Sequence, residues 1–179
     1  MSRARRGDPD AFAALVTAYQ QMAFRTAYLV LGDAAEAEDA TQEAFVKAYG
    51  ALDRFREGEP FRPWLLRIAV NAARNRRRSA GRRAGLRLRV EAGMPRDEHG
   101  ASAEAAVIAA EQRGRLIEAV NGLSADERLV IGAHYFLDLP LAEIAVLAGV
   151  PQGTVKSRLY RARARLATRL GAVMDPADG

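Results

Sequence analysis

LAEIAVLAGVPQGTVKSRLYRARARL, residues 141–166 of the chain, predicts two helices joined by a tight turn. Gly149 suits the left-handed position that ends a first amphipathic helix, and Pro151 suits the first turn of a second. In the second helix, apolar residues recur at i, i+4, i+7, i+11 and i+15 and therefore share one face: Val155, Leu159, Ala162, Leu166 and Leu170. The stretch is a candidate helix-turn-helix with a core-facing stripe.

A second face of the same helix lies roughly 130° around its axis from the apolar stripe. Its side chains are hydroxyls and guanidinium groups: Thr154, Ser157, Arg158, Arg161 and Arg165. Residues 156–169, beginning with Lys156, contain six basic side chains and no acidic one. Such donors bind base edges and phosphates, so the face favours DNA binding. A solvated basic helix would show the same pattern.

Composition limits the other possibilities. The chain has 179 residues, of which 49% are apolar, enough for one large or two small cores. No apolar run reaches the roughly 18 to 20 residues that span a bilayer, and the N-terminus has no apolar signal core, so we expect a cytoplasmic protein without membrane insertion. The chain has no Cys and two distant His, His99 and His134. We therefore expect no disulfide, no metal and no cofactor.

Charge is unevenly distributed. The net charge is +5, yet residues 8–53 contain eight Asp or Glu and only two cations, Arg25 and Lys47. Residues 74–89 contain eight Arg and no acid. An acidic surface is repelled by phosphates and should face a protein or solvent, whereas the basic segments suit DNA. The distribution suggests an adaptor with two kinds of partner.

Helix signals divide the chain into two all-α domains. In the first domain, residues 8–79, one helix ends at Gly32 and a second starts at the Asp33–Glu36 signal and runs to about Phe55. A loop at 56–60 precedes a third helix at about 61–79. A flexible basic linker at 80–101 follows, and a tail occupies 171–179. The second domain, residues 102–170, has helices at about 103–121 and 124–136, with Ser124 and Glu127 as a capping box, before the helix-turn-helix.

The third helix presents a polar face. Asn71, Arg74, Asn75 and Arg78 lie at i, i+3, i+4 and i+7, about 110° from the apolar stripe. Amide and guanidinium groups can bind bases and phosphates, but an exposed polar helix end would look alike. Trp64 lies on the inward stripe, which predicts core packing rather than a wedge between bases.

Three stretches together resemble the bacterial extracytoplasmic-function (ECF) sigma factors, the compact branch of the housekeeping-type sigma family. They are DAAEAEDATQEAFVKAYGALDRF at 33–55, PFRPWLLRIAVNAARNRRR at 60–78 and GLSADERLVIGAHYFLDLPLAEIAVLAGVPQGTVKSRLYRARARL at 122–166. The first two are similar to sigma region 2 and the third to sigma region 4. The resemblance covers nearly the whole chain.

The resemblance implies roles for individual positions. Residues of the acidic helix match the segment that docks on the β′ clamp helices of core RNA polymerase: Asp39, Gln42, Glu43 and Phe45. Phe45 also lies on the apolar stripe, so core packing is the stronger interpretation for it. Positions of the third helix match those with which the family binds the minus-10 element of the promoter: Arg62, Arg67, Asn71, Arg74, Asn75 and Arg78. The loop at 56–62 matches the segment that captures a flipped base. The helix-turn-helix matches the minus-35 reader: Thr154, Lys156, Ser157, Arg158, Arg161 and Arg165.

The function implied is promoter-specific transcription initiation. The implied partners are core RNA polymerase, through its β′ clamp helices and its β subunit, promoter DNA and an anti-sigma factor. We expect no enzymatic activity and no catalytic residue, because the chain has no Gly-Lys-Ser/Thr phosphate loop, no thiol and no His-based triad. The alternative is a stand-alone helix-turn-helix regulator, which would need no docking surface for polymerase and would usually bind a two-fold site as a dimer.

Overall fold

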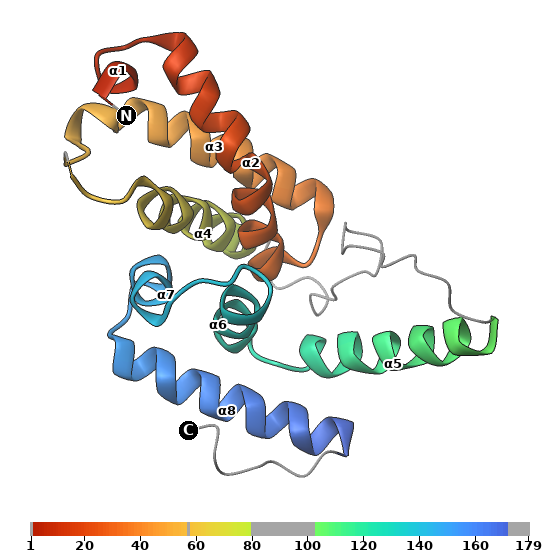
Figure 1. The fold of residues 1–179 in the computed structure, drawn as a ribbon. Coiled ribbons are helices and arrows are strands. Elements are labelled where there is room, and N and C mark those ends of the chain that lie inside the picture. Colours follow the sequence, from red (N-terminus) through yellow and green to blue (C-terminus); the bar gives the residue numbers. More distant parts are fainter. Residues whose placement is uncertain (1, 57, 80–102, 172–179) are drawn as a thin grey trace.

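A computed structural model describes residues 2–56, 58–79 and 103–171. In these ranges every regular element is helical, as the sequence predicted. The predicted linker at 80–101 lies outside the described residues, as does the tail from residue 172. The elements, shown in Figure 1, are α1 Ser2–Arg5, α2 Pro9–Leu31, α3 Ala34–Gly50, the 3-10 helix η1 Leu52–Arg54, α4 Phe61–Ser79, α5 Ala103–Asn121, α6 Ala125–Tyr135, α7 Leu141–Ala148 and α8 Gln152–Leu170.

The first half of the molecule is a bundle in which α2, α3 and α4 all contact one another, with α1 against α2 (Figure 1). Local signals set the ends of these helices. The Asp8 carboxylate caps α2 by accepting from two backbone N–H groups, and Gly32 ends it at φ 71°. Asp33 then caps α3. Alanines occupy fully buried positions on the facing helices, which lets the backbones approach closely: Ala23, Ala27, Ala40, Ala44, Ala69 and Ala73.

Two features of this half differ from the prediction. The second helix does not run to Phe55, because α3 ends at Gly50 and Ala51 leaves the helical conformation at φ −114°, ψ 5°. The chain then turns through η1, and both Leu52 and Phe55 are buried. The short helix α1, which buries Ala4, was not predicted from the sequence.

The second half comprises α5 to α8, with α8 contacting each of the other three. The predicted capping box is confirmed. Ser124 Oγ accepts from the Glu127 N–H, and Glu127 Oε2 accepts from the Ser124 N–H at 3.0 Å. The predicted turn is confirmed too, since Gly149 ends α7 with a φ of 71°. The apolar stripe of α8 is buried at Val155, Leu159 and Ala162.

The two halves contact each other directly. Helix α7 packs against α4 and helix α6 packs against α2, so the buried residues of both halves form one continuous cluster (Figure 1). Gly132 of α6 faces Leu29 so closely that a Cβ built on it would lie 2.3 Å from Leu29 Cδ2. Beside this contact, the buried Arg128 donates from Nε to the Leu29 carbonyl at 3.0 Å. We call this the closed arrangement.

We predict that Ser124→Ala lowers the free energy of unfolding by about 1 kcal/mol, because α6 loses its N-terminal cap. Urea unfolding followed by circular dichroism measures the change. Thr17→Ala is the matched control, since this exposed hydroxyl bonds only to a carbonyl of its own helix. An unchanged midpoint for Ser124→Ala would show that the capping box adds nothing to the stability of α6.

Candidate binding surfaces

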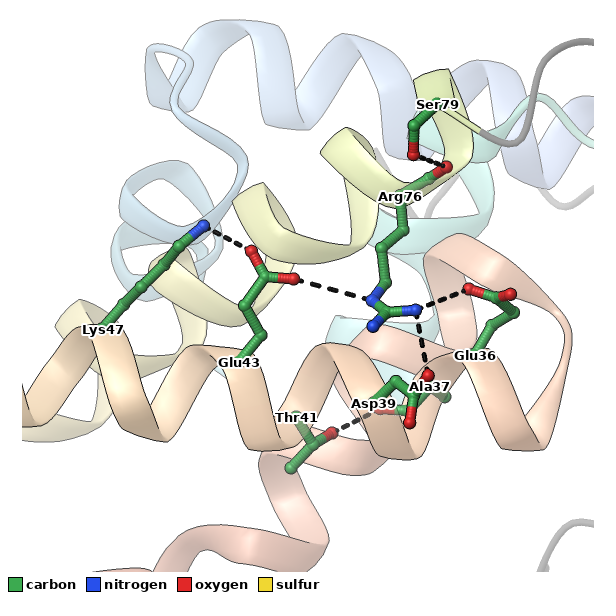
Figure 2. A network of polar contacts seen from close by, with 8 residues as sticks. All are labelled: Glu36, Ala37, Asp39, Thr41, Glu43, Lys47, Arg76 and Ser79. Carbon is green, nitrogen blue, oxygen red and sulfur yellow. Dashed lines mark hydrogen bonds and ion pairs between the residues drawn. The ribbon is translucent and has the colours of Figure 1, made fainter.

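The acidic surface lies on α3 and is organised by one arginine of α4. Figure 2 shows the Arg76 guanidinium reaching three carboxylates of α3. Nη1 lies 3.0 Å from Glu36 Oε2 and 3.1 Å from Asp39 Oδ2, and Nε lies 3.5 Å from Glu43 Oε2. Arg76 therefore holds one oxygen of each carboxylate. Sequence reasoning predicted Asp39 and Glu43 but missed Arg76, because nothing local shows which of the clustered arginines faces α3.

These carboxylates remain accessible. The Asp39 side chain is 56% exposed, and Gln42 is exposed beside it. The hydrogen bond from Lys47 lowers the pKa of Glu43, and the charge of Arg76 lowers it further against the opposing effect of burial. Val46, 73% exposed, and Tyr49 extend the surface with apolar area. The sequence pattern did not single out these two residues.

Phe45 belongs to the core instead. It is 7% exposed, and its ring packs edge-on to Phe12 with ring centroids 6.4 Å apart. A side chain in that position supports α3 from behind and has little area to offer a partner. The polymerase-docking role suggested for Phe45 by the resemblance therefore has no support in the closed arrangement.

The polar face of α4 is divided between solvent and the second half of the molecule. Asn71 and Asn75 are exposed, as are Arg67 and Arg78, and Arg78 Nη2 donates to Asn75 Oδ1 at 3.2 Å. The remaining two predicted residues, Arg62 and Arg74, point to other partners. Near the start of the helix, Trp64 packs against Phe55 and Phe61, with centroids 4.9 and 5.5 Å away, which confirms its predicted core role.

Arg62 and Arg74 contact the second half of the molecule. Arg62 makes a two-pronged ion pair with Glu143 of α7, in which Nε lies 2.8 Å from Oε2 and Nη2 bonds Oε1. Arg74 Nη2 lies 3.1 Å from Asp126 Oδ1 of α6, and its Nη1 donates to the Ala148 carbonyl at 3.2 Å. The sequence did not predict these partners, because residues 52 to 81 positions apart are paired.

The side chains of the basic face of α8 differ in exposure, although the helical pattern groups them on one face. Lys156, Ser157 and Arg161 are exposed, and Thr154 is half-buried. Arg158 is only 18% exposed and pairs with Asp126 Oδ2 at 2.9 Å.

Arg165 contacts the capping box through an ion pair with Glu127 Oε2 at 2.7 Å. Burial raises the pKa of Glu127, but the hydrogen bonds from Ser124 and the charges of Arg165 and Arg161 outweigh it and leave a net lowering. Glu127 thus stays ionised at neutral pH and neutralises part of the basic face of α8.

The described residues were also searched for a membrane-spanning helix and for a metal site. No helix there is long and apolar enough to cross a membrane. Within the same ranges, no group of three or more His, Cys, Asp or Glu side chains is placed to hold a metal ion. The surfaces that remain are an acidic one on α3 and basic ones on α4 and α8.

Comparison with known proteins assigns the chain that carries these surfaces to a family. Residues 15–83 match Sigma-70 region 2, and residues 113–166 match Sigma-70, region 4. The chain is 34% identical over 178 residues to the ECF RNA polymerase sigma factor SigW of Bacillus subtilis, covering 95% of this chain and 94% of that protein. The chain belongs to the ECF sigma factors. The RNA polymerase sigma-H factor of Pseudomonas aeruginosa is 36% identical over 169 residues, covering 91% of this chain and 88% of that protein.

Solved structures extend the likeness to both halves of this sigma factor. The sigma factor RpoE from Bartonella quintana, in complex with the anti-sigma factor NepR, superposes with a TM-score of 0.69 and 26% identity over 92% of this chain and 99% of that one. CnrH, in complex with the cytosolic domain of CnrY, gives a TM-score of 0.66 and 26% identity over 99% and 96% of the two chains.

We name the two halves after these matches below: region 2 for α2 to α4, and region 4 for α5 to α8. The family also decides between the functional classes, because both regions of a sigma factor are present in order. The chain is a sigma factor that acts in transcription initiation, and the stand-alone regulator is not favoured. The family is not an enzyme family.

We predict that Lys47→Ala raises the pKa of the Glu43 carboxyl toward its ordinary value, because the hydrogen bond from Lys47 is the main cause of the lowering. A pH titration of the Glu43 carboxyl carbon by NMR measures it. Lys47→Arg keeps the charge and the reach, and should keep the pKa low. If the pKa were equally low in Lys47→Ala, the ion pair between Lys47 and Glu43 would have no weight in solution.

Proposed function

We propose that this sigma factor binds core RNA polymerase through the exposed carboxylates of α3 and contacts promoter DNA through α4 and α8. The main observation behind this proposal is that a single chain carries an accessible acidic surface on α3 and separate basic surfaces on α4 and α8. Region 2 would act over residues 8–79 and region 4 over residues 102–170, joined by residues 80–101. Its place of action would be the cytoplasm, together with polymerase and DNA.

The proposed polymerase contact is the face of α3 that carries Asp39, Gln42 and Glu43. Arg76 fixes one oxygen of each carboxylate and leaves the remaining oxygens toward solvent or Lys47 (Figure 2). A cationic partner surface, such as the β′ clamp helices, complements this charge, and the exposed Val46 adds apolar area at its edge. Contacts with the β subunit would come from other parts of the chain.

The proposed minus-10 contact is the exposed part of α4. Asn71 and Asn75 offer amides that can pair with base edges, and Arg67 offers a cation for the backbone. The neighbouring segment at 56–62, which includes the first two residues of α4, would receive an unstacked base. Release of that base from the duplex costs a few kcal/mol, which contacts with the base and the backbone must return. Arg62 and Arg74 contribute to this surface only when region 4 does not occupy them.

The proposed minus-35 contact is the exposed side of α8, entering the major groove as the second helix of a helix-turn-helix. Ser157 and Arg161 face solvent near the start and middle of the helix, with Lys156 beside them. Thr154, Arg158 and Arg165 complete the surface, the last two after release from Asp126 and Glu127.

An anti-sigma factor is the further partner that we propose. The likeness to Bartonella quintana RpoE covers both regions, and that sigma factor is seen with its anti-sigma factor bound. A partner of this kind would recognise region 2 and region 4 in a compact arrangement.

Run-off transcription with purified core polymerase on the DNA upstream of this chain's own gene tests the function directly. Transcripts from a defined start that appear only when the protein is added are the expected result. DNA binding without initiation and without retention of core polymerase would contradict the proposal.

We predict that Asp39→Lys weakens core binding at least about tenfold, because the reversed charge opposes a cationic partner and disturbs the Arg76 cluster. Surface-immobilised core polymerase measures it at low and physiological salt. Glu118→Lys, an equal reversal on the exposed surface of α5, is the control and should bind core normally. Equal losses in both variants would mean that total charge, and not the α3 surface, governs binding.

We predict that Arg161→Ala reduces initiation from promoters that depend on a minus-35 element by roughly 5-fold to 150-fold, which corresponds to a loss of about 1 to 3 kcal/mol for one base contact. Core binding should be retained, because Arg161 lies far from α3 in the chain and on an exposed face of α8. Comparing promoters with and without the element measures the effect. A parallel loss of core binding would make the residue structural.

A further inference from the structure

Arg128 of α6 places a buried guanidinium against the C-terminal end of α2. The residue is 3% exposed. Its Nε donates at 3.0 Å to the carbonyl of Leu29, which belongs to the last turn of α2, where carbonyls have no partner within the helix. This bond uses one of the five N–H donors of the guanidinium, and its acceptor is neutral.

No carboxylate of the described residues balances the charge of Arg128. Within that part of the chain Arg128 forms no ion pair, and the one charge that acts on its pKa is the positive charge of Arg77 on α4. Burial lowers the pKa of Arg128, and the charge of Arg77 lowers it further. Arginine nevertheless stays protonated in proteins, so the buried group keeps its charge. A buried charge without an opposite charge destabilises the folded chain.

Arg77 is a second cation without an acidic partner. It is half-buried, and in the described ranges it has neither a hydrogen bond nor an ion pair. Other arginines of α4 differ in this respect, because Arg76 is held by carboxylates of α3 and Arg74 by Asp126. Like charges repel, and an anion between Arg77 and Arg128 would replace one repulsion by two attractions.

The acidic residues nearest to Arg128 in the sequence are already bound elsewhere. Asp126 holds one arginine of α4 at 3.1 Å and one of α8 at 2.9 Å. It lies two residues before Arg128, and residues at that spacing do not face each other on a helix. Glu127 accepts from Ser124 and pairs with Arg165 at 2.7 Å. The anion that would suit Arg128 is therefore not supplied by its own helix.

The two guanidinium groups suit an oxyanion with more than two oxygens. Each guanidinium presents a planar fork of N–H groups that matches two oxygens of a phosphate. A carboxylate can fill one fork, whereas a phosphoryl group has oxygens for both. The burial of Arg128 keeps a nucleic-acid backbone or a protein chain away from it, while the half-buried Arg77 gives a small ion a side of approach.

We propose that Arg77 and Arg128 form a binding site for a small phosphate-type anion, either free phosphate or the phosphoryl group of a small molecule. Helix α4 supplies one guanidinium and helix α6 the other, so the anion binds the two regions as they are packed in this structure. A ligand of this kind stabilises the packed chain increasingly as its concentration exceeds its Kd. The site uses neither of the arginine sets proposed above for DNA.

Calorimetric titration of the full chain with inorganic phosphate tests the site, with sodium chloride adjusted to hold the ionic strength constant. We expect one site per chain with a Kd at or below about 1 mM. Arg77→Gln removes one charged fork and should weaken binding at least about tenfold. Arg54→Gln removes the same charge from η1, where the Arg54 side chain is 86% exposed, and should change the Kd by less than about twofold.

Thermal unfolding separates a ligand site from a purely structural role of Arg77. At a hundredfold excess over the Kd, phosphate should raise the Tm of the parent and of Arg54→Gln by about 5 °C or more. The Tm of Arg77→Gln should stay nearly unchanged. In chloride buffer without phosphate, Arg77→Gln should be no less stable than the parent, because the substitution removes a repulsion. A structural arginine would instead lower the Tm equally in both buffers.

Two further ligands identify the anion. Acetate should bind at least about tenfold more weakly than phosphate, because it can fill one fork only. Ribose 5-phosphate distinguishes the two sources of phosphate. Binding as tight as that of inorganic phosphate would assign the site to phosphorylated small molecules, and weaker binding would assign it to free phosphate.

The buried member of the pair is tested by Arg128→Gln, whose amide can still donate to the Leu29 carbonyl while its charge is lost. This variant should also lose phosphate binding. If it failed to fold, the comparison of Arg77→Gln with Arg54→Gln would still decide the question. The proposal would be overturned by the absence of saturable binding, by equal Kd values for the parent and Arg77→Gln, or by equal affinities for acetate and phosphate.

Discussion

The arrangement of this molecule depends on the carboxylate of Asp126, which lies between an arginine of α4 and an arginine of α8. Two guanidinium groups repel each other, and they share this neighbourhood because an anion separates them. The second link is the two-pronged ion pair between Arg62 and Glu143, in the first turn of α7. Between these links the apolar residues of both regions merge into one cluster. The ion pairs fix how the two regions are aligned on each other, and the apolar cluster supplies most of the buried surface between them.

Within region 2, packing explains why α4 can carry so many cations. Its inward positions are small or aliphatic residues fully buried against α2 and α3, and its outward end is rich in arginine. Aromatic rings close one end of the bundle, where Phe61 lies edge-on to Phe55 and 5.4 Å from Tyr19 by ring centroids. Because the buried positions of α4 already supply its packing, its outward side chains are not needed for the core and can be charged.

Much of the fold could be predicted from the sequence, because its determinants are local. Gly32 and Gly149 end helices in a conformation that glycine adopts readily, and Ser124 with Glu127 marks a helix start within four residues. The end of α3 was predicted less well, since the turn into η1 is set by the distant core that buries Phe55. The helix α1 depends likewise on contacts with α2 and η1.

The binding surfaces divide in the same way. Helical spacing alone placed Asn71 and Asn75 on a common face, whereas Asp39 and Glu43 were singled out by the resemblance to the family. Spacing also grouped Arg74 with those asparagines, but the structure directs its guanidinium to region 4. A flexible side chain near two faces goes to the nearest anion, and that anion is more than 50 residues away in the chain. Partners of this kind become visible only with the tertiary structure.

Helix α4 lies between the two proposed partners of region 2. Arg76 pairs with carboxylates of α3 (Figure 2) and is the next residue after Asn75, which belongs to the proposed DNA-binding face of the same helix. In the proposed function, a shift of α4 on binding DNA through the asparagines would also move Arg76 and the carboxylates of α3 that it holds. Coupling between two binding sites is reciprocal, so any effect of bound polymerase on the affinity for DNA would equal, as a free energy, the effect of bound DNA on the affinity for polymerase. In this sigma factor, one helical turn would make promoter and polymerase each sensitive to the presence of the other.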